Sequence, residues 1–515
     1  MTASPIELLP PQPVLRVLQS PGKPRKEQLT KSDHLIVILP EKPANSLWQQ
    51  VPEGQTLIKL TKKRKLTGQI AHTRMKNQAC TGITLSCLSE SGKGNKTPGS
   101  FELLTHAGSL SADALKDHPS SVTIMVLGFV PDIEDKIVQA MVLALCAHNF
   151  AMPTFKSKPE KQSPLKTLHI SGTTKRIELT RTLAEADGLN LARWLTALPP
   201  NKLDAANYRK VLGMLAKQYN WQVEFLDEKK LHRAGAGAFL AVAQGNATKD
   251  AGIMHLHYQP KKARKGKAPL ALVGKGIIFD TGGTNLKPFK GMLDMHTDMA
   301  GSAVAVATLV TLSKLQIPFA IDCWLAITEN RIGNKAYKSR DIVTASNGIN
   351  IEVIHTDAEG RMALADTLAL AGKQKPKTII DFATLTGSCV AALTDRYSGV
   401  LTNRSELNSL LIDNGRNCGE RVWPFPMDKD FDNELKSNVA DVLQCAAAGG
   451  GDHIQAARFL QRFVPDKTTW IHMDLSAATR TGGLGQVPTE ITGFGVRYAT
   501  SLILDNLEQL NKAKA

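Results

Sequence analysis

Residues 270–287 read Leu-Ala-Leu-Val-Gly-Lys-Gly-Ile-Ile-Phe-Asp-Thr-Gly-Gly-Thr-Asn-Leu-Lys, and this stretch decides the fold. Its apolar start predicts a buried strand over Leu270–Gly274, and Asp280 stands where the apolar run gives way to Thr281-Gly282-Gly283. Two successive glycines let the backbone approach a ligand closely. A glycine-rich turn of this kind could also hold a nucleotide, but neither phosphate-loop nor dinucleotide spacing is present.

Apolar strands and helix-like segments alternate on both sides of this stretch. The further strands expected are Ala320–Ile327, Ile351–His355, Thr378–Phe382 and Trp470–Leu475, and the helices expected include Asp204–Tyr219, Ser302–Leu315, Met362–Leu370 and Ile454–Phe463. Such alternation predicts an α/β fold with a central, mostly parallel sheet that helices flank on both faces. In such sheets, functional residues gather at the carboxyl ends of the strands.

The chain has 515 residues, which is too long for one compact core and indicates two domains. Residues 155–166 are charged and contain two prolines, as an exposed connector would. We therefore expect a smaller N-terminal α/β domain with the connector over 1–167, and a larger domain over 168–515 that holds the central sheet. Apolar runs at His34–Leu39, Val122–Phe129 and Ile137–Cys146 supply the elements of the smaller domain.

Composition favours a cytoplasmic protein. The seven cysteines are scattered and form no C-x-x-C pair, so a disulfide framework is not expected. The first residues do not read as a signal peptide, and no run of about 18 apolar residues could span a membrane.

The formal net charge is +16, and part of it is bunched at residues 62–65 and 261–265. Such bunches can bind DNA or another polyanion. Neither bunch contains the aromatic residues that stack on bases, so solvated loops are the favoured interpretation.

A second segment, His355-Thr-Asp-Ala-Glu-Gly-Arg361, places Asp357 and Glu359 two residues apart. On the extended end of a strand this spacing sends both carboxylates to the same side. Two acids held together repel unless they are protonated or bound to cations, so a divalent ion is expected. The alternative is the start of a helix, where acids are favoured by the helix dipole.

Together the two segments offer four carboxylates for chemistry: Asp280, Asp298, Asp357 and Glu359. Four carboxylates suit two divalent ions such as Mn²⁺ or Zn²⁺. Two neighbouring ions can bridge one water, lower its pKa and stabilise an oxyanion.

The two segments resemble the signatures of the leucyl (cytosol) aminopeptidase family of two-metal metallopeptidases. The patterns that carry the resemblance are Lys-Gly-x-x-Phe-Asp-Thr-Gly-Gly from Lys275 and Thr-Asp-Ala-Glu-Gly-Arg from Thr356. It continues through Asn190–Asn201, Ala383–Gly387 and Gly493–Arg497, and it covers roughly residues 180–500.

The resemblance implies a metal-dependent aminopeptidase that removes N-terminal residues from peptides and assembles as a homohexamer. It assigns the metal ions to Lys275, Asp280, Asp298, Asp357 and Glu359, with Asp280 and Glu359 bridging both. It also implies that Lys287 stabilises the tetrahedral gem-diolate and that Arg361 binds a bicarbonate ion as general base. As a metal ligand, Lys275 would have to be neutral.

Three departures from the family pattern concern substrate preference: His355, residues 331–341, and Gly449-Gly-Gly-Asp-His453. Asp452 could face a cationic substrate side chain or cap the following helix. Two alternative functions remain open at this point. One is hydrolysis of a narrow set of dipeptides such as Cys-Gly, and the other is architectural DNA binding.

Overall fold

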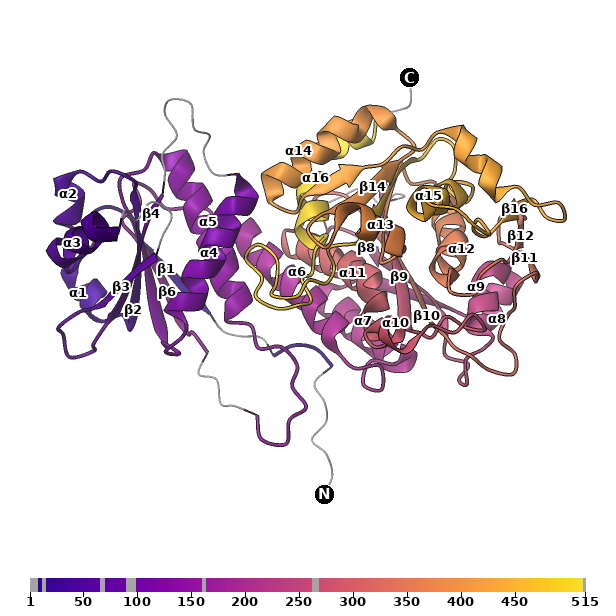
Figure 1. The fold of residues 1–515 in the computed structure, drawn as a ribbon, viewed down its shortest axis with the longest axis horizontal. Helices are drawn as coiled ribbons and strands as arrows, with labels where there is room; N and C mark the ends of the chain where they lie inside the picture. The colour runs from indigo at the N-terminus through magenta and orange to yellow at the C-terminus, as the bar shows by residue number, and fades with distance from the viewer. Residues whose placement is uncertain are drawn as a thin grey trace. The chain divides into compact units, whose positions relative to one another are not determined.

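The computed structural model describes residues 8–11, 15–64, 70–88, 99–159, 164–261 and 268–512. The chain divides into two compact units, and Figure 1 labels the elements of each. The smaller unit contains Pro11–Ala186 and Thr481–Glu490, and the larger unit contains most of the remainder. Of the two basic bunches, the structure describes only Lys261 and the backbone of residues 62–64.

The smaller unit is built on a six-stranded sheet of order β1-β6-β5-β2-β4-β3, in which only the β3–β4 pair is antiparallel. Its elements are β1 Arg16–Ser20, α1 Lys26–Thr30, β2 His34–Pro40, α2 Asn45–Trp48, α3 Gly54–Arg64, β3 Ile70–Arg74, β4 Gly82–Leu88, α4 Ser100–Ala114, β5 Ser121–Val126, α5 Pro131–His148 and β6 Thr167–Ser171. The β2 strand is buried along its whole length, as the apolar run at His34–Leu39 predicts.

The larger unit holds an eight-stranded sheet of order β15-β14-β17-β13-β9-β10-β8-β7. The central strands β17, β13, β9 and β10 run parallel, and antiparallel pairs occur only toward the two edges. The strands of this sheet are β7 Gln222–Asp227, β8 Gly252–Tyr258, β9 Leu270–Asp280, β10 Ile321–Asn330, β13 Thr378–Ala383, β14 Ser398–Thr402, β15 Val422–Pro424 and β17 Thr469–Asp474. The α/β fold with a mostly parallel central sheet is therefore confirmed.

Helices cover both faces of this sheet (Figure 1). Helices α7 and α11 pack on one face, while α9 and α12 share a core with β9 residues Ala271 and Val273 on the other. The helices of the larger unit are α6 Thr180–Ala197 (which begins in the smaller unit), α7 Ala205–Tyr219, α8 Glu228–Arg233, α9 Gly237–Ala243, α10 Phe289–Met292, α11 Ala300–Lys314, α12 Glu359–Lys373, α13 Gly387–Leu393, α14 Asn408–Cys418, α15 Asp452–Gln461 and α16 Val496–Leu510.

One expected strand lies outside the central sheet. The run Ile351–His355 forms only the short β12, Asn350–Glu352, which pairs with β11, Ile342–Thr344, and β16, Val442–Leu443, in a small separate sheet. The contact-based division between the units falls after Ala186, within α6. The boundary that we expected between residues 167 and 168 falls inside β6, and the division into 1–167 and 168–515 stays a prediction.

At Gly274 the α11 face of β9 has no room for a side chain. A Cβ atom at Gly274 would lie 2.5 Å from the Cα of Ser302, and one at Gly301 would lie 2.1 Å from the carbonyl oxygen of Phe382. Glycine at these positions lets α11 approach the sheet closely, which brings the start of that helix to the ends of β9 and β13.

We expect Gly301→Ala to lower the free energy of unfolding by about 1–3 kcal/mol, the usual cost of overpacking. The matched control is Gly213→Ala in α7, where an added Cβ meets no atom within 4 Å. This control should raise stability by about 0.5–1 kcal/mol, because alanine favours the helix. Chemical denaturation of both variants measures the difference, and equal effects would contradict this account of the α11 packing.

Candidate metal centre

The first part of the centre lies where β9 and β10 end. Asp280 is the last residue of β9 and pairs in register with Asn330, the last residue of β10. The Asn330 side-chain nitrogen donates to Asp280 Oδ1 at 2.8 Å and to the carbonyl oxygen of Thr356 at 3.0 Å. Asn330 thus orients one carboxylate and joins it to the second acidic segment.

Asp298 comes from the short 3₁₀ helix Met295–Met299 that leads into α11. Thr384, just after β13, donates from its hydroxyl to Asp298 Oδ1 at 2.8 Å. The same threonine accepts a hydrogen bond from the Lys275 ammonium on its carbonyl oxygen, at 3.1 Å. The close approach of α11 to the sheet therefore delivers Asp298 to the end of β13.

Asp357 and Glu359 lie in the cluster, but not on the extended strand end that their spacing predicts. Asp357 lies in a turn and Glu359 is the first residue of α12, so neither stands on a strand end. Thr356 fixes this turn because its hydroxyl donates to the carbonyl oxygen of Gly282 at 2.6 Å. The geometric reason given for their proximity was wrong, although the two acids do enter one cluster.

The glycine turn after β9 needs its glycines. Gly282 and Gly283 have φ angles of +84° and +66°, in the left-handed region that favours glycine. A Cβ atom at Gly282 would also lie 2.9 Å from Asp357 Oδ1. The two acidic segments can approach each other only because this turn has no side chain.

Two lysine ammonium groups lie between the carboxylates. Lys275 Nζ is 2.9 Å from Asp298 Oδ2 and 2.9 Å from Glu359 Oε1. Lys287 Nζ is 2.9 Å from Asp280 Oδ2 and 2.5 Å from Asp357 Oδ1. Lys275 is buried and Lys287 is partly exposed, so the two cations differ in their access to solvent.

The protonation equilibria show how crowded these acids are. Burial, reinforced by the charge of Asp280, raises the pKa of Glu359 to about 8. Burial also raises the pKa of Asp298 to about 6, and it raises the pKa of Asp357. Burial alone would lower the pKa of Lys275, but the charges of Asp298, Glu359 and Asp280 outweigh it and raise that pKa above its ordinary value.

The donor set suits divalent cations. Asp280, Asp357 and Glu359 each place a carboxylate oxygen within 4.8 Å of the others, and Lys275 links Asp298 to the same group. Carboxylates in this density bind hard or borderline ions such as Mn²⁺ and Zn²⁺. All five residues to which the resemblance assigns the metals are therefore brought together, and Lys287 lies among them.

One nitrogen of the Arg361 guanidinium, Nη2, is already engaged. Arg361 is buried in α12, and its Nη2 donates to both carboxylate oxygens of Asp452, at 2.8 and 2.7 Å. Burial alone would lower the pKa of Arg361, but the charge of Asp452 raises it. A bicarbonate ion on Nη2 would compete with Asp452, whereas Nε of Arg361 is buried without a hydrogen-bond partner among the described residues.

The structure corrects both interpretations of Asp452. Its carboxylate is engaged by Arg361, so it is not a free charge for a cationic substrate side chain. It also does not cap α15, because Gly451 holds the cap position and Asp452 is the first helical residue. His453 instead hydrogen-bonds Ser388 Oγ through Nδ1, at 3.0 Å, and packs edge-on against Phe425.

Sequence reasoning missed the residues that position the acids. Asn330 could have been found from the register of β9 and β10, since it stands opposite Asp280. Gln444 carried no such signal. Its side chain accepts hydrogen bonds from the Ile354 and His355 amides and donates to the Ala358 carbonyl oxygen, so it holds the turn before α12.

The fold and the cluster define a carboxylate-based metal centre at the carboxyl end of an α/β sheet. Residues 190–500 match the family model described as "Cytosol aminopeptidase family, catalytic domain". A probable cytosol aminopeptidase of Corynebacterium diphtheriae is 35% identical over 395 residues, which are 76% of each chain. The chain therefore belongs to the cytosol aminopeptidase family and is a metallo-aminopeptidase of the leucyl type.

Solved structures agree with this assignment. A mutant tomato leucine aminopeptidase superposes with a TM-score of 0.84 at 26% identity, covering 97% of this chain and 98% of that chain. The bottromycin maturation enzyme BotP in complex with Mn gives a TM-score of 0.79 at 25% identity, covering 93% of this chain and 100% of that chain.

Among the described residues, no helix is long and apolar enough to cross a membrane.

Proposed function

We propose that this chain removes N-terminal residues from peptides with two divalent ions held by Asp280, Asp298, Asp357, Glu359 and Lys275. The observation that carries the proposal is the cluster of four carboxylates, three of them buried. Lys275 lies between Asp298 and Glu359, and Lys287 lies between Asp280 and Asp357. Manganese or zinc suits these ligands, and the Mn complex of BotP supports manganese. Bound ions would activate a bridging water and polarise the substrate carbonyl.

Lys275 and Lys287 have different parts in this proposal. Lys275 is buried between Asp298 and Glu359, and it becomes a ligand only after it loses its proton to solvent. Lys287 is partly exposed and stays charged, so its ammonium can turn from Asp280 and Asp357 toward the substrate. There it would donate to the oxyanion of the gem-diolate.

We infer that Asp452 takes the place that the resemblance gives to bicarbonate. Arg361 holds this carboxylate by two hydrogen bonds, as it would hold a free carbonate-type anion. The carboxylate would accept a proton from the attacking water and return it to the leaving amine. Arg361 would keep the carboxylate oriented.

The family resemblance also supports peptides as substrates, a cytoplasmic location and a homohexamer. Light scattering, which measures the mass of the assembly, tests the homohexamer. DNA binding gains no support, because the described part of the chain includes little of either basic bunch.

Chelation tests the proposed activity. A metal-free protein, verified by elemental analysis, should lose hydrolysis of Leu-anilide, and added Mn²⁺ or Zn²⁺ should restore it. The reason is that bound ions lower the pKa of the water and polarise the substrate carbonyl, and both effects are lost with the metal. Full hydrolysis by the metal-free protein would end the two-metal proposal.

Lys287→Ala should lower kcat by about 10²–10³, the effect of one lost oxyanion contact. Metal content should stay near that of the native protein, because Lys287 is not a proposed ligand. Lys287→Arg keeps the charge and serves as the comparison variant. If Lys287→Ala loses its metal together with its activity, the residue holds the centre together and does not act on the oxyanion.

Asp452→Ala should lower kcat by about 10²–10⁴, the usual contribution of a general base. In carbonate-depleted buffer, added bicarbonate should restore part of this loss, while the native enzyme should not respond. Asp432→Ala is the matched control, since Asp432 pairs with Arg458 outside the centre. A native enzyme that bicarbonate activates, with an Asp452→Ala variant that behaves like it, would disprove the assignment.

A further inference from the structure

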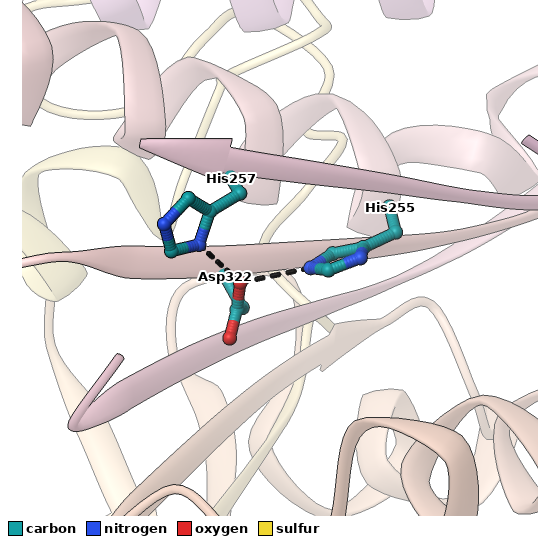
Figure 2. Close-up of side chains that lie close together, drawn as sticks. All are labelled: His255, His257 and Asp322. Carbon is teal, nitrogen blue, oxygen red and sulfur yellow. Dashed lines mark hydrogen bonds and ion pairs between the residues drawn. The ribbon is translucent and has the colours of Figure 1, made fainter. Parts of the chain in front are cut away.

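A second group of metal-type ligands lies on β8 and β10, near the edge of the central sheet. The two strands are antiparallel, with His257 opposite Asp322 and His255 opposite Trp324. Because alternate residues of a strand share a face, His255, His257, Asp322 and Trp324 all lie on one face of the sheet. Figure 2 shows both imidazole rings turned toward the Asp322 carboxylate.

The three polar side chains converge on one oxygen atom. His255 Nε2 lies 2.8 Å and His257 Nδ1 lies 2.7 Å from Asp322 Oδ1. The possible ligand atoms of the group all lie within 4.8 Å of one another. The histidine side chains are 16% and 19% exposed and that of Asp322 is 6% exposed, so an ion could enter from solvent.

Neighbouring side chains fix this geometry in advance. The His255 ring stacks on Trp324 with centroids 3.9 Å apart and planes 9° apart. Burial would raise the pKa of Asp322, but hydrogen bonds from the two histidines lower it below its ordinary value, so the carboxylate is ionised. Two paired strands provide a rigid base for all three ligands.

We propose that His255, His257 and Asp322 form a binding site for one divalent transition-metal ion. Two imidazoles and one carboxylate favour Zn²⁺, Ni²⁺ or Cu²⁺ over Mg²⁺ or Ca²⁺. Protein bonds to such ions are about 2.0–2.2 Å long. An ion at that distance from both a histidine nitrogen and Asp322 Oδ1 fits their present separation, with small rotations of the side chains.

This site is separate from the catalytic centre. Asp322 stands near the start of β10, and Asn330, which binds Asp280, ends the same strand. Eight residues at about 3.3 Å each place the two roughly 26 Å apart. The ion would connect β8 to β10 and so stabilise the edge of the sheet, without contacting the peptide substrate. The proposal does not depend on the proposed details of hydrolysis.

Without a metal, the same three side chains form a hydrogen-bonded His–Asp–His group. The experiment must therefore distinguish a metal site from this metal-free group. The full chain is first saturated with Mn²⁺, which the carboxylate centre suits, and then receives less than one equivalent of Cu²⁺. Pulsed EPR detects the remote nitrogen of a coordinated imidazole. We expect an imidazole signal in the native protein and its loss in the His255→Gln/His257→Gln double variant.

Equilibrium dialysis should show Cu²⁺ binding at least about tenfold weaker in the double variant, as expected when supports of a metal site are removed. Glutamine keeps a donor for Asp322, so the fold and the hydrolysis of Leu-anilide should be unchanged. If the double variant misfolds, Asp322→Asn provides the test. His232→Gln, an exposed histidine on α8, is the matched control. Absence of imidazole coupling in the native protein, or its persistence in the double variant, would overturn the proposal.

Discussion

Electrostatic repulsion among Asp280, Asp298, Asp357 and Glu359 is the constraint on which the catalytic unit depends. Four carboxylates, three of them buried, cannot all stay ionised without positive charge between them. In the structure that charge comes from Lys275 and Lys287, yet burial and the charge of Asp280 still raise the pKa of Glu359 and of Asp298. Divalent ions would supply more positive charge in the same space, so we expect the four carboxylates to bind them tightly.

The sheet supplies the rigidity that this repulsion demands. Asp280 and Asn330 end two paired strands, Thr384 follows a third, and glycines bring α11 against the strands that carry them. At its other end, β10 carries Asp322, which faces His255 and His257 of the neighbouring strand β8. The strand β10 thus contributes to two groups of side chains. One is rich in carboxylates and the other in imidazoles, so the two groups favour different metal ions.

The sequence predicts those parts of the centre that are local in the chain. The apolar runs of β9, β13 and β17, the acid at the end of β9 and the glycines after it all follow from short patterns. The contact between Arg361 and Asp452 could not be predicted in this way, because 91 residues separate them. The strand expected at Ile351–His355 failed because its apolar run is shared between the short β12 and the turn that Gln444 holds.

The alternation of Gly274, Lys275 and Gly276 along β9 has a consequence for how the chain folds. The two glycines face α11 and the lysine faces α12, where a Cβ at Gly360 would lie 2.6 Å from Lys275 Cε. A one-residue slip in strand pairing would drive Lys275 into the tight α11 contact, so only one pairing is compatible with the packed helices. Parallel pairing joins residues distant in the chain and forms slowly. We therefore expect the acids of the proposed metal centre to come together late in folding, after the central strands have paired.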